Sequence, residues 1–270
     1  MIRVKNQNYK CYLIDSNFII QMFKERESFG SNLINMVLSD GLFVFSPVSI
    51  WEISQDDCFD DFIATFSTLP SLLLSSEEEI ITKEAQNYYS DALTSLEDVS
   101  VPLSSFSARS LKALIKSYVS KVSSKRYKAN EKYAFSEIKN SKKIGYLCGQ
   151  TISDKKAIRS SVELAAFEFI AKAAPTFCKD LQTSNTALNV NKFPSQVSKS
   201  YIYHYKFAHP TRKGESSDLS DILISSALPY VDVYLTENSL ANSIREIKGA
   251  HGQFKHLETK TMKHMRIKQA

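Results

Sequence analysis

Glycine is scarce in this chain, and its few glycines form no phosphate-binding loop. Only 7 of the 270 residues are glycine, and neither of the usual Gly-rich patterns that hold nucleotide phosphates is present. Long hydrophobic runs are also missing, because runs such as residues 72–74 are far too short to span a bilayer. These absences argue against the common nucleotide-binding folds and against a membrane partner.

Closely spaced cysteines and a signal sequence are missing as well. The four cysteines lie far apart and form no CxxC motif, so we expect buried free thiols and no structural zinc site. Residues 1–7 lack the apolar run of a signal peptide. The sequence therefore predicts a protein of the reducing cytoplasm.

What is present is the composition of a folded protein. Hydrophobic residues make up 43% of the chain and charged residues 23%, which is ordinary for a globular domain. A chain of 270 residues can bury a sizeable core as one large domain or two small ones.

Short apolar runs alternate with segments of helical spacing near the N-terminus. Residues 11–14 and 42–45 predict strands, and residues 18–23, 32–38 and 48–53 predict helices. Residues 62–69 continue the pattern, and residues 77–89 predict a polar helix on which we expect Glu84 to face solvent. This alternation predicts a three-layer α/β/α sandwich, in which helices flank a central parallel sheet of about four or five strands.

The middle of the chain has a different character. Between residues 91 and 200 strand-like runs nearly vanish, residues 160–174 predict an amphipathic helix that Pro175 ends, and residues 184–200 predict a loop. We interpret residues 91–200 as a mostly helical insertion. The flanking segments, 1–90 and 201–255, then form one discontinuous domain, and residues 256–270 form a basic tail.

Positive charge is concentrated in the expected insertion. Between residues 109 and 159 fourteen basic residues face three acidic ones, so this segment carries +11 and the rest of the chain −6. Tyrosines are interleaved with these charges. The pattern is typical of a nucleic-acid-binding surface, and a solvated helix face is the plainer alternative. The residues that we expect to contact nucleic acid are Lys121, Lys125, Arg126, Lys128, Lys142, Lys143, Arg212 and Lys213.

Four acidic residues lie where strands end or helices begin. Asp15 follows the first predicted strand, and Glu52 lies in the helix after the second. Asp221, with Asp218 beside it, begins an apolar helix, and Glu237 follows a short strand near residue 235. Because the carboxyl ends of parallel strands meet at one edge of a sheet, these acids are expected to converge there.

Converging carboxylates repel one another and raise each other's pKa unless a cation lies among them. Oxygen ligands without histidine or thiol favour Mg²⁺ or Mn²⁺. Such an ion beside a basic surface fits hydrolysis of phosphodiester bonds. For each acid alone, helix capping or a solvated surface is the plainer interpretation.

At these positions the chain resembles the PIN-domain nucleases. The resemblance rests on residues 15–17 (Asp-Ser-Asn), 46–52 (Ser-Pro-Val-Ser-Ile-Trp-Glu), 220–227 (Ser-Asp-Ile-Leu-Ile-Ser-Ser-Ala) and 235–237 (Leu-Thr-Glu). It covers roughly residues 9–90 and 201–250 and omits the middle of the chain.

The resemblance implies a metal-dependent endoribonuclease that cuts single-stranded RNA. Asp15, Glu52, Asp221 and Glu237 would be catalytic and would hold Mg²⁺ or Mn²⁺ together with Asp218. Asn17 and Thr236 would orient ligands or water. The fourth acid departs from the family pattern, because Glu237 stands where these nucleases usually have aspartate.

Several alternatives stay open at this point. The substrate could be DNA, or the chain could be an inactive module on a PIN scaffold that binds nucleic acid or another protein. A homodimer, and a protein partner such as an antitoxin, are compatible with the sequence.

Overall fold

The computed structural model of this chain describes residues 2–4, 7–90, 92–105, 107, 109–113, 116, 155–208 and 218–265. The eight basic residues expected to contact nucleic acid, at positions 121–143 and 212–213, lie outside the described residues.

Strand β2 (Gln7–Ile14) lies inside a mostly parallel sheet. The strand order is β5-β4-β3-β2-β6-β7, and β1 pairs with β2 outside this path. Neighbouring strands from β4 to β7 in this order run parallel, whereas β1 and β5 pair antiparallel with β2 and β4. The other strands are β1 (Ile2–Val4), β3 (Gly41–Phe45), β4 (Ser71–Leu74), β5 (Ser100–Pro102), β6 (Val233–Leu235) and β7 (Glu258–Lys260).

Side chains alternate across this sheet and are buried on both faces. In β2, Cys11 and Leu13 belong to one core cluster, whereas Tyr12 and Ile14 belong to another. Such alternation is the two-residue period of a strand, and burial on both faces is typical of a parallel sheet. Both predicted strands near the N-terminus, 11–14 and 42–45, are confirmed as parts of β2 and β3.

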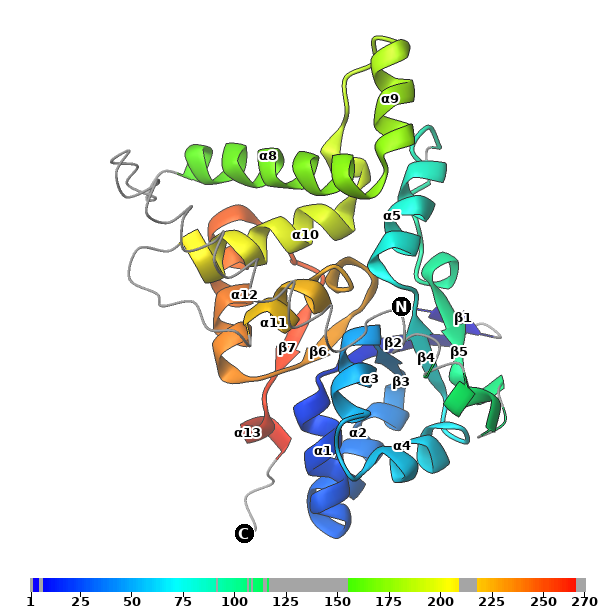
Figure 1. The fold of residues 1–270 in the computed structure, drawn as a ribbon. Coiled ribbons are helices and arrows are strands. Elements are labelled where there is room, and N and C mark those ends of the chain that lie inside the picture. Colours follow the sequence, from blue (N-terminus) through cyan, green and yellow to red (C-terminus); the bar gives the residue numbers. More distant parts are fainter. Residues whose placement is uncertain are drawn as a thin grey trace.

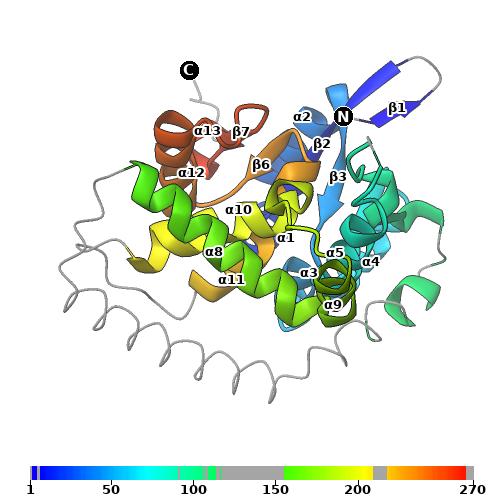
Figure 2. The ribbon, with the colours of Figure 1, turned by 90° about the horizontal axis from the view of Figure 1, so that it is seen from above.

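Helices cover each face of the sheet, as Figures 1 and 2 show. The face that contains Tyr12 packs against residues of α1 (Ser16–Lys24), α2 (Ser31–Asp40), α3 (Pro47–Ile53) and α4 (Phe59–Phe66). The face that contains Leu13 packs against residues of α5 (Glu77–Gln86), α8 (Lys155–Ala173), α10 (Pro194–Tyr203), α11 (Asp218–Ser225) and α12 (Asn238–His251). The predicted α/β architecture with helices on both faces of a central sheet is therefore present. The prediction of a parallel sheet of four or five strands is wrong in detail, because the sheet of the described residues has seven strands, of which β1 and β5 pair antiparallel.

The middle of the chain contributes to the core of the sheet. Ile158 and Val162 of α8 belong to the same cluster as Leu13. Helix α8 lies alongside α10 in Figures 1 and 2 and ends at Ala173, just before Pro175 begins α9 (Pro175–Thr183). The segment that we interpreted as an insertion thus supplies part of the helical layer.

The loop predicted for residues 184–200 is wrong in its second half. Helix α10 begins at Pro194, which suits the first helical position because its missing N–H is not needed there. Its buried residues include Ser195, Gln196 and Ser198. Because several of the buried positions of α10 carry polar side chains, the apolar spacing that predicts a helix is weak in its sequence.

The C-terminal part adds a strand that the sequence pattern does not predict. Residues 258–260, which we assigned to the basic tail, form β7 beside β6, and the short helix α13 (Met262–Met265) follows.

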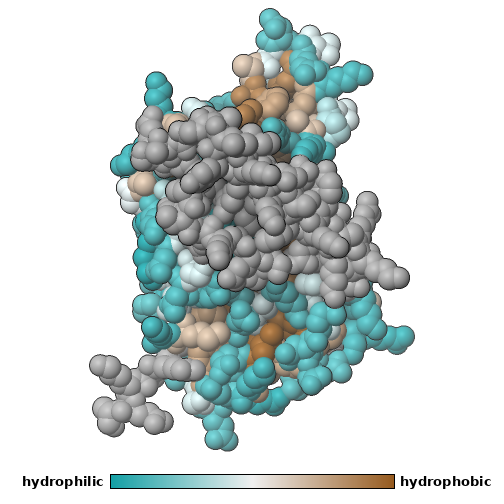
Figure 3. All heavy atoms as spheres, turned by 60° about the vertical axis from the view of Figure 1, so that its left-hand side comes forward, coloured by the Kyte–Doolittle hydropathy of each residue, from teal (hydrophilic) through white to brown (hydrophobic). Residues whose placement is uncertain are grey.

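The molecular surface carries mostly hydrophilic residues over the lower part of the face in Figure 3. A hydrophobic area lies at the top of that view, at the height of α9 in Figure 1. Within the described part of the chain, no helix has both the length and the apolar composition needed to cross a membrane.

Candidate active site

Asp15 lies where β2 and β6 end side by side. Its backbone N–H donates to the carbonyl of Leu235 at 3.0 Å. Its carboxylate accepts hydrogen bonds from the backbone N–H of Asn17 (3.3 Å), from Ser16 Oγ (3.2 Å) and from Thr236 Oγ1 (3.2 Å). The bond from Asn17 caps α1, so the capping interpretation of Asp15 is confirmed. Capping does not exclude a second role.

Other acidic groups surround Asp15. The side chain is 5% exposed, and burial raises its pKa to about 7, with further contributions from the negative charges of Glu52 and Asp221. Acids from three separate segments of the chain therefore act on one another at this edge of the sheet, as the positions after the strands predict.

Glu52 is held toward Asp15 by a shared serine. Ser46 caps α3 by accepting a hydrogen bond from the Ser49 N–H at 3.0 Å, and Glu52 lies near the end of this short helix. The Ser16 hydroxyl lies 2.5 Å from Glu52 Oε2 and 3.2 Å from Asp15 Oδ1. Ser16 therefore bridges two of the predicted site residues.

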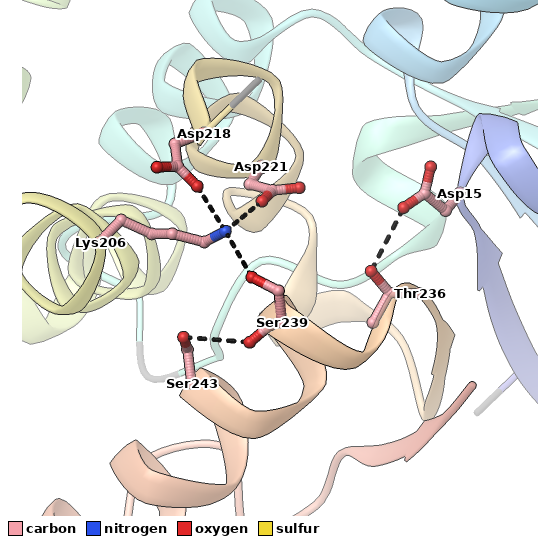
Figure 4. A network of polar contacts seen from close by, with 7 residues as sticks. All are labelled: Asp15, Lys206, Asp218, Asp221, Thr236, Ser239 and Ser243. Atoms are coloured by element: carbon pink, nitrogen blue, oxygen red, sulfur yellow. Dashed lines mark hydrogen bonds and ion pairs between the residues drawn. The ribbon is translucent and has the colours of Figure 1, made fainter. Parts of the chain in front are cut away.

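Asp218 and Asp221 lie in the first turn of α11 and share a buried ammonium group. Lys206 Nζ is 2.6 Å from Asp218 Oδ1 and 2.5 Å from Asp221 Oδ2. It comes from the π-helical turn His204–Ala208 and also donates to Ser239 Oγ at 3.4 Å. Figure 4 shows Asp221 with one carboxylate oxygen bonded to Lys206 and the other turned toward Asp15.

Burial and neighbouring acids raise the pKa of Asp221, whereas Lys206 lowers it. Burial is the largest effect on this carboxyl group and raises its pKa to about 6, although the Lys206 ammonium acts in the opposite direction. Glu237 and Asp218 add to the rise. Asp221 thus joins the Asp15 side of the site to the Lys206 side.

The remaining predicted residues lie at the margin of the site. Glu237 is exposed and precedes α12 without making a side-chain cap, although its charge acts on Asp221. The side chain of Asn17 is exposed, and its backbone N–H makes the contact with Asp15. Thr236 is fully buried and bonded to Asp15, as a residue that orients a ligand would be.

The donors of this site are chemically suited to a hard divalent cation. They are carboxylate and hydroxyl oxygens, which Mg²⁺ and Mn²⁺ prefer. Within the described ranges, no three acids, histidines or cysteines are close enough together to hold one ion. An ion bound here would take one or two carboxylates and keep several waters, as Mg²⁺ commonly does.

No family model, curated protein or solved structure significantly matches this chain.

Ser16 and Lys206 are not assigned a role by the sequence patterns. Lys206 is separated from Asp218 and Asp221 by 12 and 15 positions, and no local pattern shows that its ammonium is buried. Its neighbours Tyr205 and Phe207 are the single available signal, since a lysine between aromatic residues can lie in a core.

The solvated face expected for Glu84 is wrong. Glu84 is 1% exposed and accepts hydrogen bonds from Ser195 N (2.9 Å), Ser195 Oγ (2.6 Å) and Tyr230 OH (2.5 Å). Burial raises its pKa to about 7, against the effect of these donors. The polar sequence of α5 predicts an exposed helix. It does not indicate these contacts, because the partners are more than a hundred residues away in the chain.

Proposed function

We propose that this chain is a metal-dependent endoribonuclease on a PIN-like α/β/α scaffold. The observation that carries the proposal is the burial of Asp15 beside Glu52 and Asp221 at the carboxyl ends of parallel strands. An arrangement of mutually repelling carboxylates is unfavourable by itself and becomes favourable when a cation is bound.

The chain's own residues hold the acids in place. The Asn17 N–H and the Thr236 hydroxyl donate to opposite oxygens of Asp15 and so fix the plane of its carboxylate. Ser16 donates to Glu52, and Lys206 fixes Asp221. Of Asp15, Glu52 and Asp221, one or two carboxylates would bind Mg²⁺ or Mn²⁺ directly and the others through water, with Asp218 and Glu237 at the margin. The ion would activate a water molecule and offset negative charge on the phosphate.

RNA is the substrate that we favour, on the basis of the basic segment and the resemblance to PIN-domain nucleases. In the described part of that segment, Lys155, Lys156 and Arg159 are exposed at the start of α8. Contacts of this kind bind the phosphate backbone in a salt-dependent manner. A cytoplasmic location belongs to the same proposal.

The test is cleavage of an unstructured RNA in the presence of Mn²⁺. Asp15→Asn keeps the size of the side chain and removes its charge, so cleavage should fall by about 100-fold or more. Asp180→Asn, on the exposed surface of α9, is the matched control and should cut like the wild type. Equal cutting by Asp15→Asn and the wild type would refute the assignment. A DNA strand of the same sequence, in competition, decides between RNA and DNA.

A non-catalytic module on the same scaffold is the second candidate, and Lys206 favours it. The ammonium already neutralises part of the Asp218–Asp221 charge, and a site balanced in this way needs less help from a metal ion. Calorimetry separates the two functions, because an inactive module of this kind should bind no Mn²⁺.

A further inference from the structure

Lys206 is a buried cation enclosed by oxygen atoms. Its side chain is fully buried, and its ammonium contacts Asp218, Asp221 and Ser239. An ammonium group has three N–H donors, so these three oxygens can use all of them. Because Lys206 does not reach the surface, it cannot serve as a contact for a nucleic-acid phosphate.

The two sides of the acidic site differ in their cations. Asp218 and Asp221 share Lys206, whereas no lysine, arginine or histidine of the described residues forms an ion pair with Asp15 or Glu52. Instead, Asp15 and Glu52 accept hydrogen bonds from neutral groups. Among the described residues, a basic side chain therefore balances negative charge on the Asp218–Asp221 side, and none does so on the side of Asp15 and Glu52.

We propose that Lys206 is a built-in counter-ion that takes the position of a second cation, so that the site binds a single divalent ion on the side of Asp15 and Glu52. This inference rests on the proposed function. Lys206 acts as a positioning residue, since it fixes the Asp221 carboxylate with one oxygen directed away from the ammonium toward Asp15 (Figure 4).

The number of Mn²⁺ ions bound per chain tests this role. Calorimetry on the full chain should give one ion for the wild type and two for Lys206→Met, because a divalent ion with its waters could then take the place of the ammonium beside Asp218, Asp221 and Ser239. Lys199→Met is the matched control. Lys199 lies on α10 and pairs with Glu77 at 2.5 Å, so its loss removes the same charge away from the site and should leave one ion.

Removal of the ammonium takes a positive charge away from two buried carboxylates, which destabilises the fold. Thermal unfolding is therefore measured for the same variants with and without Mn²⁺. The melting temperature of Lys206→Met should fall without the ion and should rise with Mn²⁺ by more than that of the wild type. Lys206→Gln is a second variant, because its amide keeps two N–H donors for the carboxylates while it removes the charge.

The outcomes separate this inference from the proposed function. A second ion in Lys206→Met or Lys206→Gln supports the counter-ion role. One ion in both folded variants overturns it while the nuclease proposal stands, and so does a failure of both variants to fold at any Mn²⁺ concentration. If the wild type binds no ion but a Lys206 variant binds one, Lys206 acts as a counter-ion for Asp218 and Asp221, whereas the single-ion site and the proposed function both fail.

Discussion

Asp15 and Glu84 are both buried carboxyl groups whose pKa burial raises to about 7, but their neighbours differ in kind. Around Glu84, the donors are Ser195 and Tyr230, which connect α5 with α10 and with the turn that precedes β6. Around Asp15, the hydrogen-bond donors are similar in number, yet the negative charges of Glu52 and Asp221 are the largest effects after burial. One acid, Glu77, also acts on Glu84, but its effect is smaller than that of the donors and Lys199 pairs with it. Burial and hydrogen bonding alone therefore do not distinguish a structural carboxyl group from a functional one.

The like charges make the distinction. A buried carboxyl group that is satisfied by donors stabilises the native state, and its loss leaves those donors unpaired. A buried carboxyl group that faces other acids is repelled by their negative charge. Such an arrangement is typical of a site that binds a cation. On this basis Glu84 belongs to the fold and Asp15 to the function.

The largest expected difference is in stability without metal ions. Glu84→Ala should lower the free energy of unfolding by about 3 kcal/mol, because Ser195 and Tyr230 lose their buried acceptor. Asp15→Asn should instead raise it by about 1 kcal/mol, since the amide relieves repulsion from Glu52 and Asp221. Urea denaturation in the presence of a chelator measures both values. A large loss of stability in Asp15→Asn would remove the distinction between the two groups.

The pH dependence of stability should contain a contribution from Glu84. Its pKa is about 7 in the folded protein and 4.5 in the reference state, so the folded protein keeps a proton that the unfolded chain releases between these values. The contribution is therefore complete below pH 4.5 and is lost as the pH rises toward 7, by up to ~3 kcal/mol.

Glu84→Gln tests this contribution, because the amide cannot titrate. Its stability should change less than that of the wild type between about pH 5 and about pH 8. Subtraction of the two profiles cancels the titration of Asp15, which both proteins share. Two parallel profiles would mean that Glu84 does not take up a proton on folding.

The smallest expected effect concerns single hydroxyl groups. Thr236→Val and Ser195→Ala each remove one hydroxyl donor from a buried carboxyl group, so each should lower stability by about 1 kcal/mol. Only Thr236→Val should change the affinity for Mn²⁺, which calorimetry measures. If the wild type, Thr236→Val and Ser195→Ala bind Mn²⁺ with equal affinity, Thr236 has a structural role only.

The parts of the fold that the sequence predicts are those with local signals. Residues 11–14 and 42–45 are short apolar runs, and the helices near the N-terminus have apolar spacing and, for α1 and α3, capping side chains at Asp15 and Ser46. These signals depend on a few neighbouring residues. Because they also set the topology of a parallel sheet, they were sufficient to predict that the acids after the strands lie near one another.

The parts that the sequence does not predict depend on distant partners. Helix α10 buries serine and glutamine, which have no hydrophobic period. Lys206 and Glu84 carry charged side chains, which from the sequence alone are expected on the surface. They are buried because residues from other segments pair with them or donate hydrogen bonds to them. The sequence therefore predicts the acids of the site but not the lysine that pairs with them.

The serine-lined side of α10 also limits which changes the neighbouring helix tolerates. The Ser198 hydroxyl donates to the carbonyl of Ser225, the last residue of α11, at 2.5 Å. The distance between two helix axes follows the size of the side chains at their contact. A leucine at position 198 would force α11 outward and move Asp221 with it. The geometry of the acidic site therefore depends on residues between α10 and α11 that contact none of its carboxylates.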